Sequence, residues 1–152
     1  MFWPFKSRKP AEPCFQIGQY KIDTRIDLRG GFEPLSNEDI ALLNPDISFE
    51  GEQILHAPDA HFMHCRWGTV LGVVHGEIYK IGVQWTGPQS EVGRLERQIK
   101  VECTKRYGKG ESWRIWDCAD GNIIVYANNL GSDAVLTVTV TSWRVRQFKR
   151  VQ

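Results

Sequence analysis

A single amphipathic stretch, from about Pro88 to Tyr107, restricts what this chain can fold into more than any other feature of the sequence. Apolar residues recur in it at steps of three and four, and this spacing places them in one narrow stripe along a helix. The residues of the stripe are Val92, Leu95, Ile99, Cys103 and Tyr107. Proline suits the first turn of a helix, and Gly108 supplies the backbone freedom that ends one. We therefore expect one principal helix over about 88–107, packed on one face of a sheet.

Strand-like sequence precedes this helix. Two apolar runs, at 70–74 and 78–85, are separated only by the short connection His75-Gly76-Glu77. Two runs joined by so short a turn are typical of a β-hairpin. In the second run alternate residues share one face, as in a half-buried strand. These residues are Tyr79, Ile81, Val83 and Trp85.

Three more strands are expected after the helix, over about 113–117, 122–127 and 136–141. Asp120-Gly121 is a strong signal for a tight turn between the first two, and residues 128–133 have the composition of a loop. Because short turns join antiparallel neighbours, the order from residue 69 onward should be β-β-α-β-β-β. These elements predict an α+β fold with a mostly antiparallel sheet.

The N-terminal half gives weaker signals. Apolar residues alternate over 15–28, which indicates one or two short strands, and a pattern similar to a capping box indicates a short helix at about 36–43. Further strands are expected at 53–56, 62–67 and 69–74. One helix cannot cover both faces of such a sheet. We expect residues 15–67, a second subunit or a ligand to cover the second face.

Residues 1–13 differ from the rest of the chain in composition. They hold three aromatic residues, followed by three basic ones and by Pro10 and Pro13. Chain ends of this kind are usually flexible, so we expect a flexible tail over 1–13 and a single α+β domain over 14–152. The alternative is weak contact with an anionic membrane surface, too short to anchor the protein alone. The residues available for that contact are Phe2, Trp3, Phe5, Lys6, Arg8 and Lys9.

Charge and cysteine content argue against some classes of protein. A net charge of +1, with both signs interspersed, argues against a nucleic-acid-binding protein, which would carry an excess of Lys and Arg. No stretch approaches the roughly 18–20 apolar residues of a transmembrane helix. The four cysteines are scattered and form no C-x-x-C motif, so we expect reduced thiols in a cytoplasmic protein. They are Cys14, Cys65, Cys103 and Cys118.

The segment from residue 56 to residue 65 holds the best candidates for metal ligands. Imidazole and thiolate are the ligands that zinc prefers, and the segment offers His56, His61, His64 and Cys65. Their spacing matches no zinc finger, zinc hydrolase or deaminase motif. In a strand His61 and His64 would point to opposite faces, although His61 could still act with Cys65. In a turn of helix His61, His64 and Cys65 would lie together.

No pattern for catalysis stands out. The sequence contains no Gly-x-Ser-x-Gly nucleophile elbow. Cys65 lies next to His64, but neighbours on a strand face opposite ways. Gly108-Lys109-Gly110 follows a helix, whereas phosphate-binding loops precede one. We therefore do not expect an enzyme.

The aromatic residues of the C-terminal half are the remaining candidates for a binding surface. Trp116 has the opposite parity to Trp113 and Ile115, and Trp143 has the opposite parity to the strand before it. These two residues, together with Tyr126, predict a sheet face that binds a protein partner or a small apolar ligand, or that forms a homodimer. Packing in the core is the alternative for the same residues.

These observations favour a non-enzymatic binding or interaction module without a cofactor. The strand–helix–Tyr-Gly–strand-with-Trp–Asp-Gly-Asn–strand pattern of residues 77–127 resembles small bacterial proteins, and this resemblance implies no activity. The alternative is a metal-binding protein, or a metal-dependent hydrolase, that holds zinc in the His56–Cys65 segment.

Overall fold

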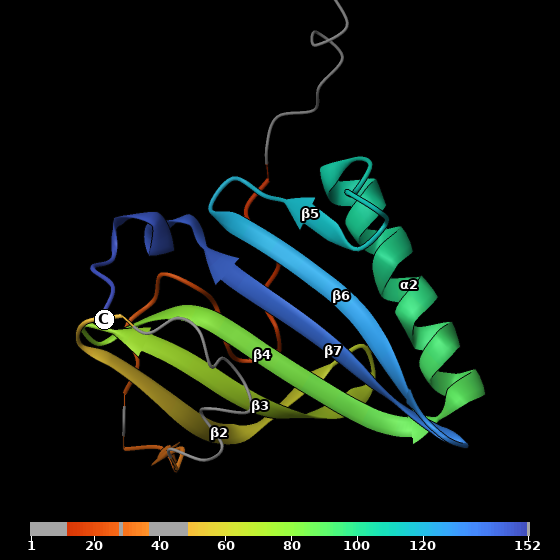
Figure 1. Cartoon of the computed structure of the whole chain (residues 1–152), viewed down its shortest axis with the longest axis horizontal. Helices are drawn as coiled ribbons and strands as arrows, with labels where there is room; N and C mark the ends of the chain where they lie inside the picture. Colours follow the sequence, from red (N-terminus) through yellow and green to blue (C-terminus); the bar gives the residue numbers. More distant parts are fainter. Residues whose placement is uncertain (1–11, 28, 37–48, 152) are drawn as a thin grey trace, which may run out of the picture.

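One antiparallel sheet of seven strands forms the body of the protein in the computed structural model, which describes residues 12–27, 29–36 and 49–151 (Figure 1). The strand order across the sheet is β1-β2-β3-β4-β7-β6-β5. The strands are β1 (Glu33–Pro34), β2 (Glu52–Phe62), β3 (Cys65–Val74), β4 (Glu77–Pro88), β5 (Ile115–Asp117), β6 (Gly121–Leu130) and β7 (Asp133–Ser142). The predicted α+β fold and the order of elements from residue 69 onward are therefore confirmed.

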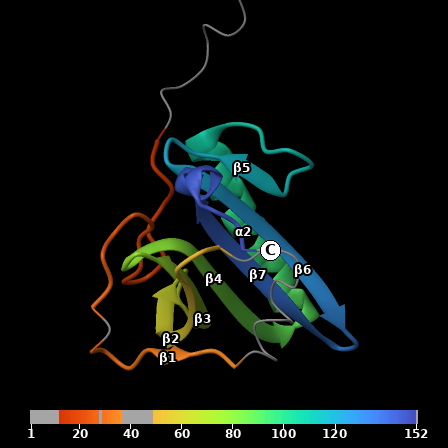
Figure 2. The ribbon, with the colours of Figure 1, turned by 60° about the vertical axis from the view of Figure 1, so that its left-hand side comes forward.

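The helix α2 (Gln89–Tyr107) lies on one face of this sheet, where it contacts β4, β5, β6 and β7 (Figure 2). It begins directly after Pro88 and ends at Gly108, whose φ of 87° no other residue type adopts as easily. The predicted stripe is its buried face, made by Val92, Leu95, Ile99 and Cys103. The periodicity of the sequence thus predicts both the limits and the orientation of the helix.

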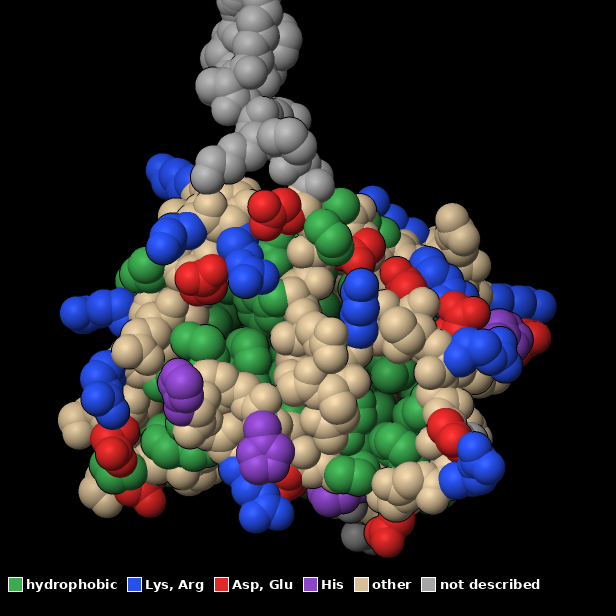
Figure 3. Space-filling model, turned by 180° about the vertical axis from the view of Figure 1, so that it is seen from behind, with side chains coloured by type: hydrophobic (Ala, Val, Ile, Leu, Met, Phe, Trp, Pro, Cys, Tyr) green, Lys and Arg blue, Asp and Glu red, His purple; other side chains and the backbone are tan. Residues whose placement is uncertain are grey.

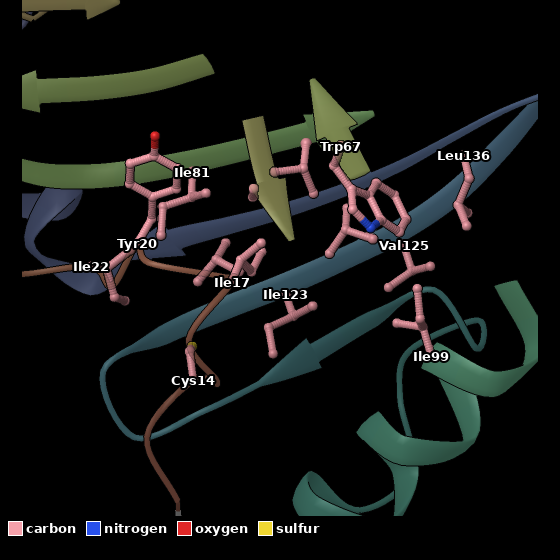
Figure 4. Packing of buried hydrophobic residues seen from close by; sticks show 14 of the residues in the cluster. Cys14, Ile17, Tyr20, Ile22, Trp67, Ile81, Ile99, Ile123, Val125 and Leu136 are labelled. Carbon is pink, nitrogen blue, oxygen red and sulfur yellow. The ribbon is translucent and has the colours of Figure 1, made fainter. Parts of the chain in front are cut away.

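The N-terminal segment, residues 14–26, packs on the same face of the sheet as α2. Its buried side chains join one continuous core with the strands and the helix (Figure 4). They are Cys14, Ile17, Tyr20 and Ile22. The predicted short strands are absent from the described part of this segment, which forms only the isolated bridges Ile17–Tyr20 and Arg25–Glu77. Residues 15–67, a second subunit and a ligand were the expected covers of the second face; of the first of these, the part around Ile17, Tyr20 and Ile22 lies on the first face instead, in one core with the helix.

Only one corner of the second face is covered by described residues. There Phe49 and Phe148 pack edge-on against Tyr79, with ring centroids 5.6 and 5.4 Å away. Val74 lies beneath these rings, so this corner is a second, smaller core. Towards β6 the face consists of cross-strand rows such as Tyr126, Thr137 and Gln84, opposite one another in β6, β7 and β4.

Two predicted boundaries in the sheet are wrong. A strand was expected over 62–67, but the chain reverses at Met63-His64 between β2 and β3. A loop was expected over 128–133, but β6 and β7 stay paired to Leu130 and Asp133, and only two residues turn between them. At the first boundary a turn without glycine or asparagine interrupts the predicted strand. At the second, pairing between β6 and β7 continues through residues of low strand propensity.

Other predictions for turns and ends fared better. The β3–β4 hairpin turns at His75-Gly76, as predicted. The helix expected at 36–43 and most of the expected tail lie outside the described residues. The end of that tail, Glu12 and Pro13, is ordered, since the Glu12 carbonyl accepts a hydrogen bond of 2.8 Å from Ala119 N–H. The division into a tail over 1–13 and a domain over 14–152 stays a prediction.

Candidate functional site

The structure does not bring the four predicted metal ligands together. His56 and His61 lie exposed on β2, five residues apart, which is about 16 Å along a strand. His64 lies in the turn after β2, while Cys65 begins β3 on the side of Trp67 and the core. In the described part of the chain, no three His, Cys, Asp or Glu residues form a group that could hold a metal ion.

Trp116 does not face an open surface but packs in the core, which was the alternative for this residue. Its side chain is only 1% exposed, and its Nε1 donates a hydrogen bond of 3.3 Å to Thr104 Oγ1 on α2. The indole lies so close to the backbone of Gly110 that a Cβ there would be 2.5 Å from the ring. The buried and exposed sides of this segment are exchanged relative to the prediction. Trp116 points to the core, whereas Trp113 belongs to a turn before β5 and is 47% exposed.

Trp143 and Tyr126 are half-buried. Trp143 leaves β7 at the start of a short 3-10 helix, η2 (Trp143–Gln147), where its Nε1 donates to the Cys118 carbonyl at 3.0 Å. The guanidinium of Arg146 lies 4.1 Å from the centroid of its ring. Tyr126 lies on the face opposite α2, beside Thr137. The three aromatic residues therefore do not share one binding surface.

A groove runs between α2, the β2–β3 turn and the start of the N-terminal segment. Its volume of about 770 Å³ is in the range of sites that hold small molecules. Figure 3 views this side of the molecule, where hydrophobic side chains lie in hollows between Lys, Arg and His side chains. The groove is lined by Phe15, Gln16, Phe62, Met63, His64, Arg97, Gln98, Ile99, Val101, Glu102 and Arg106.

Aromatic rings form one wall of this groove. Phe15 and Phe62 pack together with ring centroids 5.5 Å apart, and Phe62 contacts Trp67 at 5.8 Å. Trp67 is fully buried, and its Nε1 donates a hydrogen bond of 2.7 Å to the Phe62 carbonyl. This bond fixes the last residue of β2 on the core, so the wall is held in one position rather than built on a loose loop.

The turn beside this wall has an unusual backbone. Met63 and His64 both have positive φ, 51° and 62°. Two positive φ values suit the tight turn of a hairpin, but Asn-Gly or Asp-Gly is the sequence that adopts them readily. Side chains other than glycine cost roughly 1–2 kcal/mol per residue in this region. Strained backbone of this kind gathers at binding and active sites, and here both residues line the groove.

The opposite wall is the exposed flank of α2. Val101 is 47% exposed, which makes it one of the most exposed large apolar side chains among the described residues. Nine residues separate Arg97 from Arg106, or about 13 Å along a helix. Arg106 forms an ion pair of 2.9 Å with Glu102 and lies 5.9 Å from the ring of Phe15. Arg97 forms no ion pair with any described residue.

Tyr107 links the end of α2 to the N-terminal segment. Its hydroxyl donates a hydrogen bond of 3.1 Å to the Pro13 carbonyl, and its ring lies 6.3 Å from Phe15. Burial raises the pKa of the Tyr107 hydroxyl, so this donor stays protonated at neutral pH. The contact positions Phe15 at the groove even though 92 residues separate it from Tyr107 in sequence.

The lining of the groove is mostly apolar, with a few ionisable groups. The groove holds one carboxylate, Glu102, which is already paired with Arg106, and one imidazole, His64. Among the described residues, Glu102 is the one carboxylate that lines this groove. Apolar surface with a few polar groups at the edge is typical of ligand sites.

Sequence reasoning missed this groove because its residues come from three distant segments, at 15–16, 62–64 and 97–106. One signal was available: Val101 is an apolar residue on the polar side of the helical stripe. None of the described helices is both long and apolar enough to cross a lipid bilayer. Comparisons of the chain with protein-family models, with curated proteins and with solved structures gave no match.

Proposed function

We propose that this chain is a non-catalytic binding protein and that the groove beside α2 holds an elongated apolar ligand. The observation that carries the proposal is the Met63-His64 turn, which keeps two side chains at the groove in a backbone conformation that they disfavour. A turn with no role beyond joining β2 to β3 would be more stable as Asn-Gly.

The exposed apolar surface supports the same function. Phe15, Phe62 and Met63 are only partly buried, although each packs against the core. With Val101 opposite them, they leave a continuous apolar surface that folding alone does not cover. Such surface usually marks a place where a partner or ligand completes the burial. Methionine suits it well, because its flexible side chain adapts to ligands of different shape.

The two other candidate surfaces have less support. The sheet face predicted from Trp116, Trp143 and Tyr126 loses its main residue, since Trp116 is buried. The zinc alternative has less support, because no three of His56, His61, His64 and Cys65 gather into a group that could hold a metal ion among the described residues. A binding function therefore rests on the groove.

A cytoplasmic location is part of the proposal. The four cysteines are free thiols, and three of them are buried. Free thiols in this number are typical of reducing compartments.

Fluorescence titration with Nile red, a neutral apolar dye, tests the proposal. We expect the dye to bind the full chain, and Val101→Gln to weaken binding several-fold by placing an amide in the groove. Leu130→Gln is the matched control, because Leu130 is 60% exposed at the far end of β6 and does not line the groove. Equal binding by both variants, or no binding by the wild type, would contradict the proposal.

A further inference from the structure

The two ends of the groove differ in charge. At one end the charge of Arg106 is neutralised by Glu102, 2.9 Å away, and the guanidinium lies over Phe15. At the other end Arg97 is exposed and forms no ion pair with any described residue. Between them Val101, one helical turn after Arg97, presents its apolar side chain to the groove. Along the axis of α2, the lining of the groove thus has an unpaired cation at Arg97 and, about 13 Å further on, a charge-paired arginine beside the aromatic ring of Phe15.

This polarity defines the chemistry of the ligand. An anionic group at Arg97 would gain a charge-assisted hydrogen bond, whereas at the other end Glu102 would repel it. Guanidinium presents two parallel N–H groups that match the two oxygens of one carboxylate. An alkyl chain attached to that carboxylate would run past Val101 and end at Phe15 and Phe62, over the roughly 13 Å that the helix spans between the two arginines.

We infer that the ligand of the groove is a single-chain carboxylate, with its head at Arg97 and its alkyl chain on Val101, Phe15, Phe62 and Met63. The inference rests on the proposed function and narrows it to one class of ligand. Arg97 binds the head, and the aromatic wall fixes the direction of the chain.

Isothermal titration calorimetry with three decyl compounds tests the inference, all used below their micellar concentrations. The compounds are decanoate, 1-decanol and decyltrimethylammonium, which share a chain and differ in the head. We expect decanoate to bind roughly tenfold more tightly than 1-decanol, because a charge-assisted hydrogen bond is added, and the cation to bind most weakly. Shortening the chain should weaken binding roughly fourfold for each methylene removed.

Substitution of the arginine separates the head from the chain. Arg97→Gln should abolish the preference for decanoate over 1-decanol. Arg114→Gln is the matched control, because Arg114 is an exposed arginine beside β5 and does not line the groove. It should keep the full preference for decanoate.

The outcomes distinguish this inference from the proposed function. Equal affinity for decanoate and 1-decanol would overturn the carboxylate inference and leave the groove as an apolar binding site. A preference for decanoate that survives Arg97→Gln would overturn the role of Arg97. No binding of any compound would overturn both the inference and the proposed function.

Discussion

The two turns at the ends of β3 have the same geometry and different sequences. Met63-His64 enters the strand and His75-Gly76 leaves it, and all four residues have positive φ: 51° and 62° in the first turn, 52° and 79° in the second. In the second turn glycine occupies the position with the largest positive φ, where it costs little conformational energy. The first turn has no glycine. Its stability therefore depends on the structure around it.

The surroundings of the two turns explain the difference. At the first turn Trp67 holds Phe62 through its indole N–H, and Phe62 packs on Phe15. At the second turn His75 is exposed, and neither residue of the turn lines the groove beside α2. The first turn can keep its strained backbone because the packing around it over-determines its conformation.

Removal of the packing beneath the first turn should have the largest effect. Trp67→Ala deletes a fully buried indole and its hydrogen bond to Phe62, so we expect the free energy of unfolding to fall by about 3–5 kcal/mol. Urea unfolding measures this change. Val70→Ala, on the same strand but half-buried on the other face, should cost much less. Equal losses would show that the first turn does not depend on Trp67.

A change at the second turn should have a smaller effect. Gly76→Ala places a Cβ at φ 79°, 3.2 Å from Arg25 Nη2, and should destabilise the protein by about 1–2 kcal/mol. The same substitution at Gly93, in the middle of α2 with nothing within 4 Å of the new Cβ, should stabilise it by about 0.5–1 kcal/mol. Thermal unfolding of both variants checks the opposite signs. No change in stability for Gly76→Ala would show that the second turn does not depend on glycine at this position.

Conversion of the first turn to the readily formed sequence should sharpen the comparison. The double variant Met63→Asn, His64→Gly removes the strain, and we expect it to raise the free energy of unfolding by about 1 kcal/mol. Because both side chains line the groove, the same variant should bind Nile red more weakly. Urea unfolding and dye titration on one preparation measure the two effects. A gain in stability without a loss of dye binding would show that the strained turn is not needed for binding in the groove.

Local patterns in the sequence predicted the parts of this fold that local physics determines. The stripe from Val92 to Cys103 has a period that only a helix produces, and His75-Gly76 has the composition of a tight turn. Met63-His64 has neither glycine nor asparagine, so its turn was hidden inside a predicted strand. Nothing in the local sequence shows that Trp67 and Phe15 will hold it in place.

The error at Trp116 has the same origin. β5 has only three residues, too few for alternation to identify the buried side. The structure decides it through the backbone of Gly110, which approaches the indole closely. The groove was equally hidden, since Phe15, Met63 and Arg97 meet only through the tertiary fold. Contacts between distant segments, rather than propensities, create this site.

Two cysteines, one beside the first turn and one on the buried face of α2, should show the smallest effect. Cys65 follows the Met63-His64 turn and is half-buried, while Cys103 is fully buried on the inner face of α2, where burial raises its thiol pKa to about 12. Thiolate is the reactive form, so at pH 8 we expect iodoacetamide to label Cys65 well before Cys103. Peptide mass spectrometry over time measures both rates.

The same pKa predicts how stability changes in alkali. The ordinary pKa of a cysteine thiol is 9.0, so folded Cys103 keeps its proton up to a higher pH than the unfolded chain does. Its contribution to stability is complete below pH 9 and is lost as the pH rises towards about 12. Cys103→Ala should flatten the fall of the unfolding free energy over this range.

The double variant Met63→Asn, His64→Gly should make Cys65 react more slowly with iodoacetamide, because the relaxed turn exposes Cys65 less often. The labelling rate of Cys103 should stay unchanged. Equal labelling rates of Cys65 in the wild type and in the double variant would show that strain in the first turn does not control access to Cys65.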